Sequence, residues 1–215
     1  MKVYSLVLAV LLLLPLGCVT PRSVELDYLP GKAAPVPEKR VKVAVMPFED
    51  TTWNGQEDQH WVGLASLYQE KLTSPLSISQ LVTRAVKKEI EAYGHELSSD
   101  EIYTIQISRK DIKTLLKKIP YTQVDYLVGG AVSHFFIHQK VRFVADVEIE
   151  AFIVRPVDGE TIWSKKLGYR EERIPFTPDT FTESSQTVLN RLLDKTIKDL
   201  FRNSDFQLFL IKDKK

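Results

Sequence analysis

The stretch DYLVGGAVSHFFIHQ (residues 125–139), together with VRFVADVEIEAFIV (141–154), decides the fold of this chain. In the second segment, apolar residues occupy every odd-numbered position from 143 to 153, and charged residues fall between several of them. Such alternation predicts a strand with one buried face and one polar face. We therefore expect two long, neighbouring antiparallel strands joined by a tight turn near Gln139.

On the carboxyl side, Asp158-Gly159 predicts a further hairpin into ETIWSKKLGYR (160–170). Thr180-x-x-Glu183 has the pattern of a capping box, which opens a helix ending near Phe201. The inward positions of this helix are Val188, Leu189, Leu192, Leu193, Ile197, Leu200 and Phe201. The final segment, 206–211, is apolar on both faces, and we expect it to pair with its own sheet or to supply an edge to a partner.

On the amino side, VKVAVMPF (41–48) predicts a strand buried on both faces. Residues 49–75 are expected to form a long loop with at most one weak helical turn. Ser77-x-x-Gln80 is a second capping box, and the apolar positions that follow predict an amphipathic helix up to Gly94. A short strand over 103–107 and a helix from Ile112 to Ile119 complete the series.

The whole order is β-α-β-α-β-β-β-α, with the long antiparallel hairpins in the second half. Helices must cover the apolar face of such a sheet. The fold class predicted is therefore α/β (α+β), with a single mixed sheet in two or three layers.

The first residues have the layout of a secretory signal. Lys2 supplies a positive charge, and residues 3–16 are almost wholly apolar before the small residue Gly17. This run is shorter than the roughly 20 residues that cross a bilayer as a helix. Gly17-Cys18 resembles the end of a bacterial lipobox, where the cysteine is acylated and becomes the new amino terminus. The alternative is that Cys18, the single cysteine, is an ordinary thiol behind an uncleaved anchor.

We expect three parts in the chain: a lipoprotein signal peptide (1–17), a lipidated cysteine with a proline-rich tether (18–40), and one periplasmic α/β domain (41–215). The tether could be a linker or an extended arm. Removal of residues 1–17, which hold one cation and no anion, takes the formal net charge from +1 to zero. A neutral chain has no electrostatic footprint for nucleic acid.

Three segments together resemble a known group: VKVAVMPFEDTT (41–52), VDYLVGGAV (124–132) and DGETIWSKKLG (158–168). They are similar to segments of envelope lipoproteins with a TolB amino-terminal-like domain, a group that includes the curli-secretion lipoproteins and YajG-like lipoproteins. The resemblance implies fold and compartment, and it carries no catalytic residues. By the usual lipoprotein sorting rule, Val19 in place of Asp implies the outer membrane.

No pattern in the sequence indicates catalysis. The motifs Gly-x-Ser-x-Gly, His-Glu-x-x-His and the phosphate-binding loop are absent. His134 and His138 share a strand face but lie about 13 Å apart, too far to bind one metal ion. Asp146, Glu148 and Glu150 fit the solvated face of a strand better than a catalytic pair. Gly129-Gly130 fits a bulge or close packing better than a phosphate loop. We therefore expect no enzyme activity, no cofactor and no metal.

Binding is the function that the sequence favours. Trp53 and Trp61 lie in a polar segment, and they are either interface anchors or a lid on the core. The leading hypothesis is an outer-membrane-anchored lipoprotein that binds other envelope components. The alternative is an auxiliary subunit of a transport or secretion assembly, with a homo-oligomer as one form.

Overall fold

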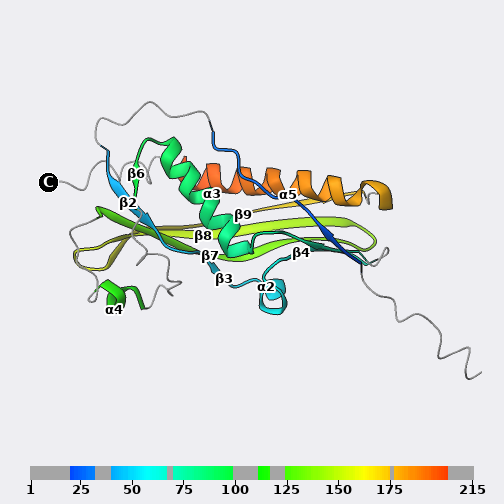
Figure 1. Cartoon of the computed structure of the whole chain (residues 1–215), viewed down its shortest axis with the longest axis horizontal. Coiled ribbons are helices and arrows are strands. Elements are labelled where there is room, and N and C mark those ends of the chain that lie inside the picture. The colour runs from blue at the N-terminus through cyan, green and yellow to red at the C-terminus, as the bar shows by residue number, and fades with distance from the viewer. Residues whose placement is uncertain are drawn as a thin grey trace, which may run out of the picture.

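The computed structural model describes residues 20–31, 40–66, 70–98, 111–116, 124–174 and 177–202. These residues form one nine-stranded mixed sheet with helices on both of its faces (Figure 1). The predicted fold class, an α/β (α+β) domain with a single mixed sheet, is confirmed. No helix in the described ranges is long and apolar enough to span a bilayer.

Three long antiparallel strands contain most of the residues of the sheet: β7 (Tyr126–Gln139), β8 (Phe143–Arg155) and β9 (Glu160–Arg173). Both predicted hairpins are confirmed. Gly159 has a φ of 70° in the β8–β9 turn, a conformation that glycine adopts without strain. A bulge between Val132 and His134 interrupts the pairing of β7 with β8. The glycine pair is explained by close packing, because Gly130 faces the Phe48 ring and the Glu150 carbonyl.

The other edge of β7 pairs with three short parallel strands in succession: β2 (Lys42–Val45), β3 (Glu49–Asp50) and β4 (Trp61–Ala65). Beyond β2 lies β6 (Glu96–Leu97), and beyond β4 lie β5 (Glu70–Thr73) and β1 (Thr20–Ser23). The predicted loop over 49–75 is therefore wrong in part, since the segment contains β3, β4 and β5. The short helix α2 (Trp53–Glu57) agrees with the single helical turn allowed there. Strands this short have little alternation of their own, and their partners determine them.

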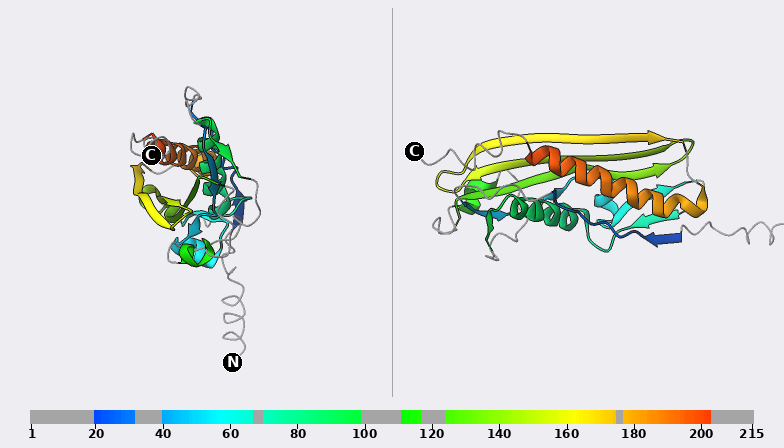
Figure 2. Two further views of the ribbon diagram at one scale, coloured as in Figure 1. Left: turned by 90° about the vertical axis from the view of Figure 1, so that its left-hand side faces the viewer. Right: turned by 90° about the horizontal axis from the view of Figure 1, so that it is seen from above.

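Helices α3 (Ile78–Ala92) and α5 (Pro178–Phe201) cover one face of the sheet and enclose the main core (Figure 2). The capping box at Ser77 and Gln80 is confirmed. The capping box predicted at Thr180 is wrong, because α5 begins at Pro178 with Thr177 as its N-cap. Proline suits the first helical position, where its missing N–H costs no hydrogen bond.

Within the described ranges, helices cover the opposite face of the sheet at only two places. At one end, α4 (Ile112–Leu116) packs on a small second core with Met46, Leu127 and Phe152. Farther along the sheet lies α2 (Figure 1). The predicted strand 103–107 and the carboxyl-terminal segment 206–211 lie outside the described residues.

The predicted tether of residues 18–40 differs from the structure over residues 20–31, which pack on the domain. Strand β1 pairs with β5, and Val24, Leu26 and Tyr28 are buried in the main core. Their period-two spacing places three side chains on one face of an extended segment. Residues 20–31 are thus a docked arm, and the packed domain begins before residue 41.

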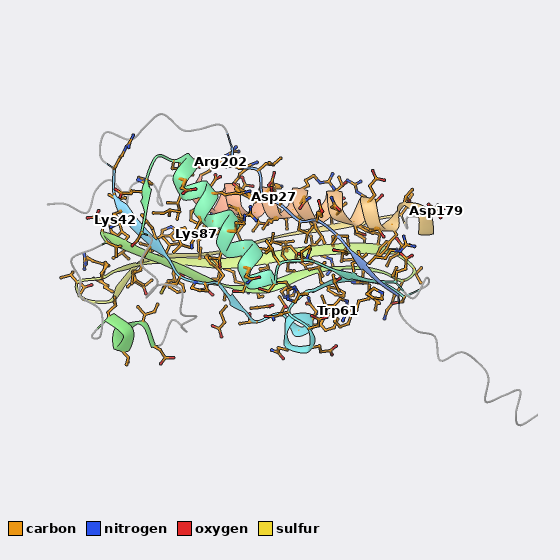
Figure 3. The ribbon with its side chains drawn as sticks, viewed as in Figure 1. Asp27, Lys42, Trp61, Lys87, Asp179 and Arg202 are labelled. Atoms are coloured by element: carbon orange, nitrogen blue, oxygen red, sulfur yellow. The ribbon has the colours of Figure 1, made fainter. Side chains whose placement is uncertain are left out.

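The docked arm is held between α3 and α5. The backbone N–H groups of Glu25, Asp27 and Leu29 donate to side chains one helical turn apart on α5. The acceptors are Gln186 Oε1 (3.2 Å), Asn190 Oδ1 (3.1 Å) and Asp194 Oδ1 (3.3 Å). Two residues of extended chain rise about as far as four residues of helix, so the pattern repeats along both. Figure 3 shows Asp27 beside α5.

Candidate functional site

An aromatic cluster formed by Trp53, Trp61 and Phe136 lies on the face of the sheet opposite α3 and α5. The Trp53 ring centroid is 5.2 Å from that of Trp61 and 4.8 Å from that of Phe136, and all three rings meet edge to face. Trp53 remains 54% exposed. The two tryptophans singled out in the sequence are therefore neighbours, and β7 supplies a third ring between them.

Hydrogen bonds around α2 fix the position of Trp53, the first residue of this helix. The Thr52 hydroxyl accepts from the Gly55 N–H at 2.9 Å and donates to Asp50 at 2.6 Å. The Asn54 side chain is fully buried, and its Nδ2 donates to the carbonyls of Trp61 and Phe135. This amide therefore joins α2 to both β4 and β7.

Trp61 is held from two further directions. Its indole Nε1 donates to the Gly63 carbonyl at 2.8 Å. The Lys71 ammonium lies 4.8 Å from the ring centroid and pairs with Asp58 at 2.8 Å. Lys71 thus holds the pKa of the Asp58 carboxyl below its usual range. Trp61 is a rigid support, whereas Trp53 presents its ring to solvent.

A pocket of about 420 Å³ adjoins the aromatic cluster. Its apolar wall includes Trp53, Leu64, Phe136 and Val144. The polar lining residues are Asn54, Ser66, His134, His138, Lys140, Asp146 and Arg170. An apolar wall with a few convergent polar groups is the usual composition of a ligand site.

The polar side of the pocket carries two fixed cations, Lys140 and Arg170, and one anion, Asp146. Burial lowers the pKa of His138, and the nearby charges of Lys140 and Arg170 lower it further. His134 Nδ1 lies 3.4 Å from an Asp146 carboxylate oxygen. The Asn54 Oδ1 atom is buried and has no hydrogen-bond partner within the described structure. The pocket therefore combines the cations of Lys140 and Arg170 with the Asp146 carboxylate, whereas the Asn54 Oδ1 atom is enclosed by the protein.

The carboxylates predicted for the solvated strand face take part in side-chain pairs on that face. Glu148 accepts from Lys166 and from the Ser133 hydroxyl, each at 2.6 Å. These contacts, led by Lys166, lower the pKa of Glu148. Among the described residues, no three His, Cys, Asp or Glu side chains are grouped as metal ligands.

The other sequence candidates are placed as follows. The His60 ring atom Nδ1 lies 2.9 Å from the Ser74 carbonyl oxygen. The Asp58 carboxylate accepts a hydrogen bond from the backbone N–H of His60 at 3.0 Å. His60 and Asp58 therefore stabilise the local backbone conformation. Cys18 lies outside the described residues. Phe136 was missed, although it has the same strand parity as His134 and His138, which would have placed it on their face.

No protein-family model matches the chain, and no curated protein matches it in sequence. Among solved structures, it is similar to a Xanthomonas campestris protein of the DUF330 family, with a TM-score of 0.57 and 12% identity, covering 90% of this chain and 97% of that one. It is also similar to the PelC dodecamer from Paraburkholderia phytofirmans (TM-score 0.44, 14% identity, 79% of this chain and 93% of that chain).

A further similar structure is the lipoprotein GNA1162 from Neisseria meningitidis (TM-score 0.37, 13% identity, 70% of this chain and 96% of that chain). The first likeness shows a shared fold over nearly the whole of both chains. Solved structures similar to this chain thus include a bacterial lipoprotein, and the comparisons identify no individual family by sequence.

Proposed function

We propose that the chain is a non-catalytic lipoprotein, held at the outer membrane by acylated Cys18, whose domain binds other envelope components. The sequence supports the anchor, because an apolar run over residues 3–16 ends in Gly17-Cys18. Acyl chains on this cysteine would hold the domain at the membrane surface.

The exposed Trp53 ring, packed on Trp61 and Phe136 beside a pocket, is the observation that carries the binding proposal. A large ring left in water is unfavourable, and aromatic side chains of this kind dominate the energetics of interfaces. The hydrogen bonds of Thr52 and Asn54 already order this region, so binding loses little conformational entropy. Lys140 and Arg170 in the pocket lining favour a partner segment with an aromatic or aliphatic anchor next to an acidic group.

The anchor is tested by labelling cells with a clickable fatty acid. We expect the wild-type protein to incorporate the label and to fractionate with membranes. Cys18→Ala should lose the label and accumulate as unprocessed or unanchored protein. Equal labelling of the two proteins would contradict the anchor.

The binding site is tested with a photo-crosslinking amino acid at position 53 in cells. The matched control is position 157, since Val157 is 70% exposed in the β8–β9 turn, far from the pocket. We expect a discrete adduct from position 53 that is absent from position 157. An adduct at twice the mass of the chain would identify the partner as a second copy. The same adducts from both positions, or none from position 53, would contradict the site.

A further inference from the structure

The start of β1, the β7–β8 turn and the end of β9 all lie at one end of the sheet. Register pairs join Thr20 to Glu70, Glu70 to Ala65 and Ala65 to Gln139. The same row continues from Gln139 to Phe143 and from Phe143 to Arg173. The β7–β8 turn and the end of β9 therefore lie at the end of the molecule where β1 begins (Figure 1).

The proposed acylation site lies very close to this end. Cys18 precedes Thr20 by two residues, which span at most about 7 Å of extended chain. No longer tether is available, since β1 is paired with β5 and the docked arm is fixed on α5. Acyl chains on Cys18 would thus bring this end of the domain, and no other, to the lipid surface.

Two aliphatic side chains project from the same end. Val141, in the β7–β8 turn, is 85% exposed, and Ile174, directly after β9, is 86% exposed. Lys140, Arg142 and Arg173 adjoin them in the sequence and are themselves at the surface. Arg142 pairs with Glu172 at 2.7 Å, and Arg173 pairs with Glu171.

We propose that this end, formed by Lys140–Arg142 and Arg173–Ile174, rests on the membrane that holds Cys18, with Val141 and Ile174 in the headgroup boundary. The inference depends on the proposed anchor. Aliphatic side chains beside cations suit the interface with anionic lipid. Each contact is weak alone, but the anchor raises its effective concentration, so a small patch suffices to orient the domain.

The orientation has a definite geometry. The β8–β9 turn with Val157 lies at the opposite end of the long strands. Because β9 is 14 residues long, the β8–β9 turn would stand roughly 45 Å from the membrane. The pocket is lined by Ser66 and Lys140, so it would open to the side near the lipid surface.

The test uses the full lipidated protein in vesicles of phosphatidylethanolamine and phosphatidylglycerol. Cys18 is the single cysteine, and its thioether does not react with thiol probes, so a cysteine placed at 141, 174 or 157 carries the only fluorophore. We expect lipids with a nitroxide quencher to quench positions 141 and 174 several-fold more than position 157. Val141→Asp should reduce quenching at 174, whereas Val157→Asp should leave it unchanged.

The outcomes separate the two proposals. If the protein floats with the vesicles but all three positions are quenched equally, this end does not face the membrane, although the anchor stands. If position 174 is unquenched and instead crosslinks to position 174 of another chain, the patch is a contact between copies. If the protein does not float with the vesicles, the anchor itself fails, and this orientation fails with it.

Discussion

Gly130 occupies the most crowded backbone position on β7. A Cβ atom there would lie 2.1 Å from the Glu150 carbonyl oxygen and 2.2 Å from the Phe48 ring. The carbonyl belongs to the neighbouring strand, and Phe48 is fully buried, so neither can move without disturbing the sheet. Gly130 is therefore needed for its small size.

We expect Gly130→Ala to destabilise the domain by about 3 kcal/mol, the upper part of the range for overpacked cores. Gly31→Ala is the matched control, because its Cβ would meet only the ends of Arg202 and Lys198, each at 3.9 Å. Urea unfolding of the two variants measures the difference. A Gly130→Ala protein as stable as the control would show that β7 and Phe48 can separate at little cost.

A second prediction concerns His95, which is only 9% exposed after the end of α3. Burial lowers the pKa of its imidazole. In the unfolded chain the same group takes up a proton near pH 6.5. As the pH falls below this value, the unfolded state binds a proton that the folded state resists, so the free energy of unfolding decreases.

We therefore expect the Tm to fall between pH 7.5 and pH 5.5, and His95→Leu to make that fall smaller. His138→Gln should reduce it further, because burial also lowers the pKa of His138. Thermal melts followed by circular dichroism measure both effects. An unchanged pH dependence in His95→Leu would show that His95 does not contribute to it.

At the scale of single residues, the sequence indicated part of the site. Trp53 and Trp61 stood out as large rings in a polar segment, and the structure places them in contact. The pocket could not be predicted, because it depends on how β4 aligns with β7, more than 70 residues later. That register is set by tertiary packing.

At the scale of elements, the docked arm is a structural part of the domain. Val24, Leu26 and Tyr28 are buried, and the Tyr28 hydroxyl donates to the buried Glu89 carboxylate. Burial, followed by this contact, raises the pKa of Tyr28. Removal of the arm would expose the core and leave Glu89 without this donor.

A chain that begins at residue 40 should therefore be much less stable than one that begins at residue 19. Three buried side chains at about 1.5–3 kcal/mol each amount to about 4.5–9 kcal/mol, against a typical total of about 5–15 kcal/mol. Leu29→Ser is the control within the arm, because Leu29 is 68% exposed. Urea unfolding compares the three proteins. Equal stability of the short and long chains would contradict a structural role for the arm.

The elements with a strong period were predicted from the sequence. The helix expected from Ser77 to Gly94 is α3, and the two long hairpins are β7, β8 and β9. An extended arm was one of two alternatives for this segment, but its burial was missed. Its three apolar residues stand among prolines and charges, and so short a pattern cannot be separated from a linker. Its burial depends on α5, more than 160 residues away.

At the scale of the whole molecule, β7 and β9 occupy contrasting places in the sheet. β7 is paired with β8 on one edge and with β2, β3 and β4 on the other, whereas β9 pairs with β8 alone in the described part of the chain. Half of the β9 residues are charged, a composition that discourages pairing with other chains.

Hydrogen exchange should reflect this contrast. We expect the amides of β7 to exchange most slowly, and the amides of residues 165–173 in β9 that point away from β8 to exchange fast. Mass spectrometry of peptides from the unlipidated monomer measures both. Slow exchange of all amides from 165 to 173 would contradict this expectation, and protection of residues 206–211 at the same time would locate the carboxyl-terminal segment at this edge.

The docked arm also sets an order of events during biogenesis. Residues 25–29 leave the ribosome long before their partners at 186–194, which follow more than 150 residues later. The arm therefore stays undocked until residues 186–194 have emerged. Enzymes that cleave and acylate near Cys18 would meet a flexible substrate, and docking would follow as the closing step of maturation. A chain stalled before residue 186 should remain open to proteases along its first segment.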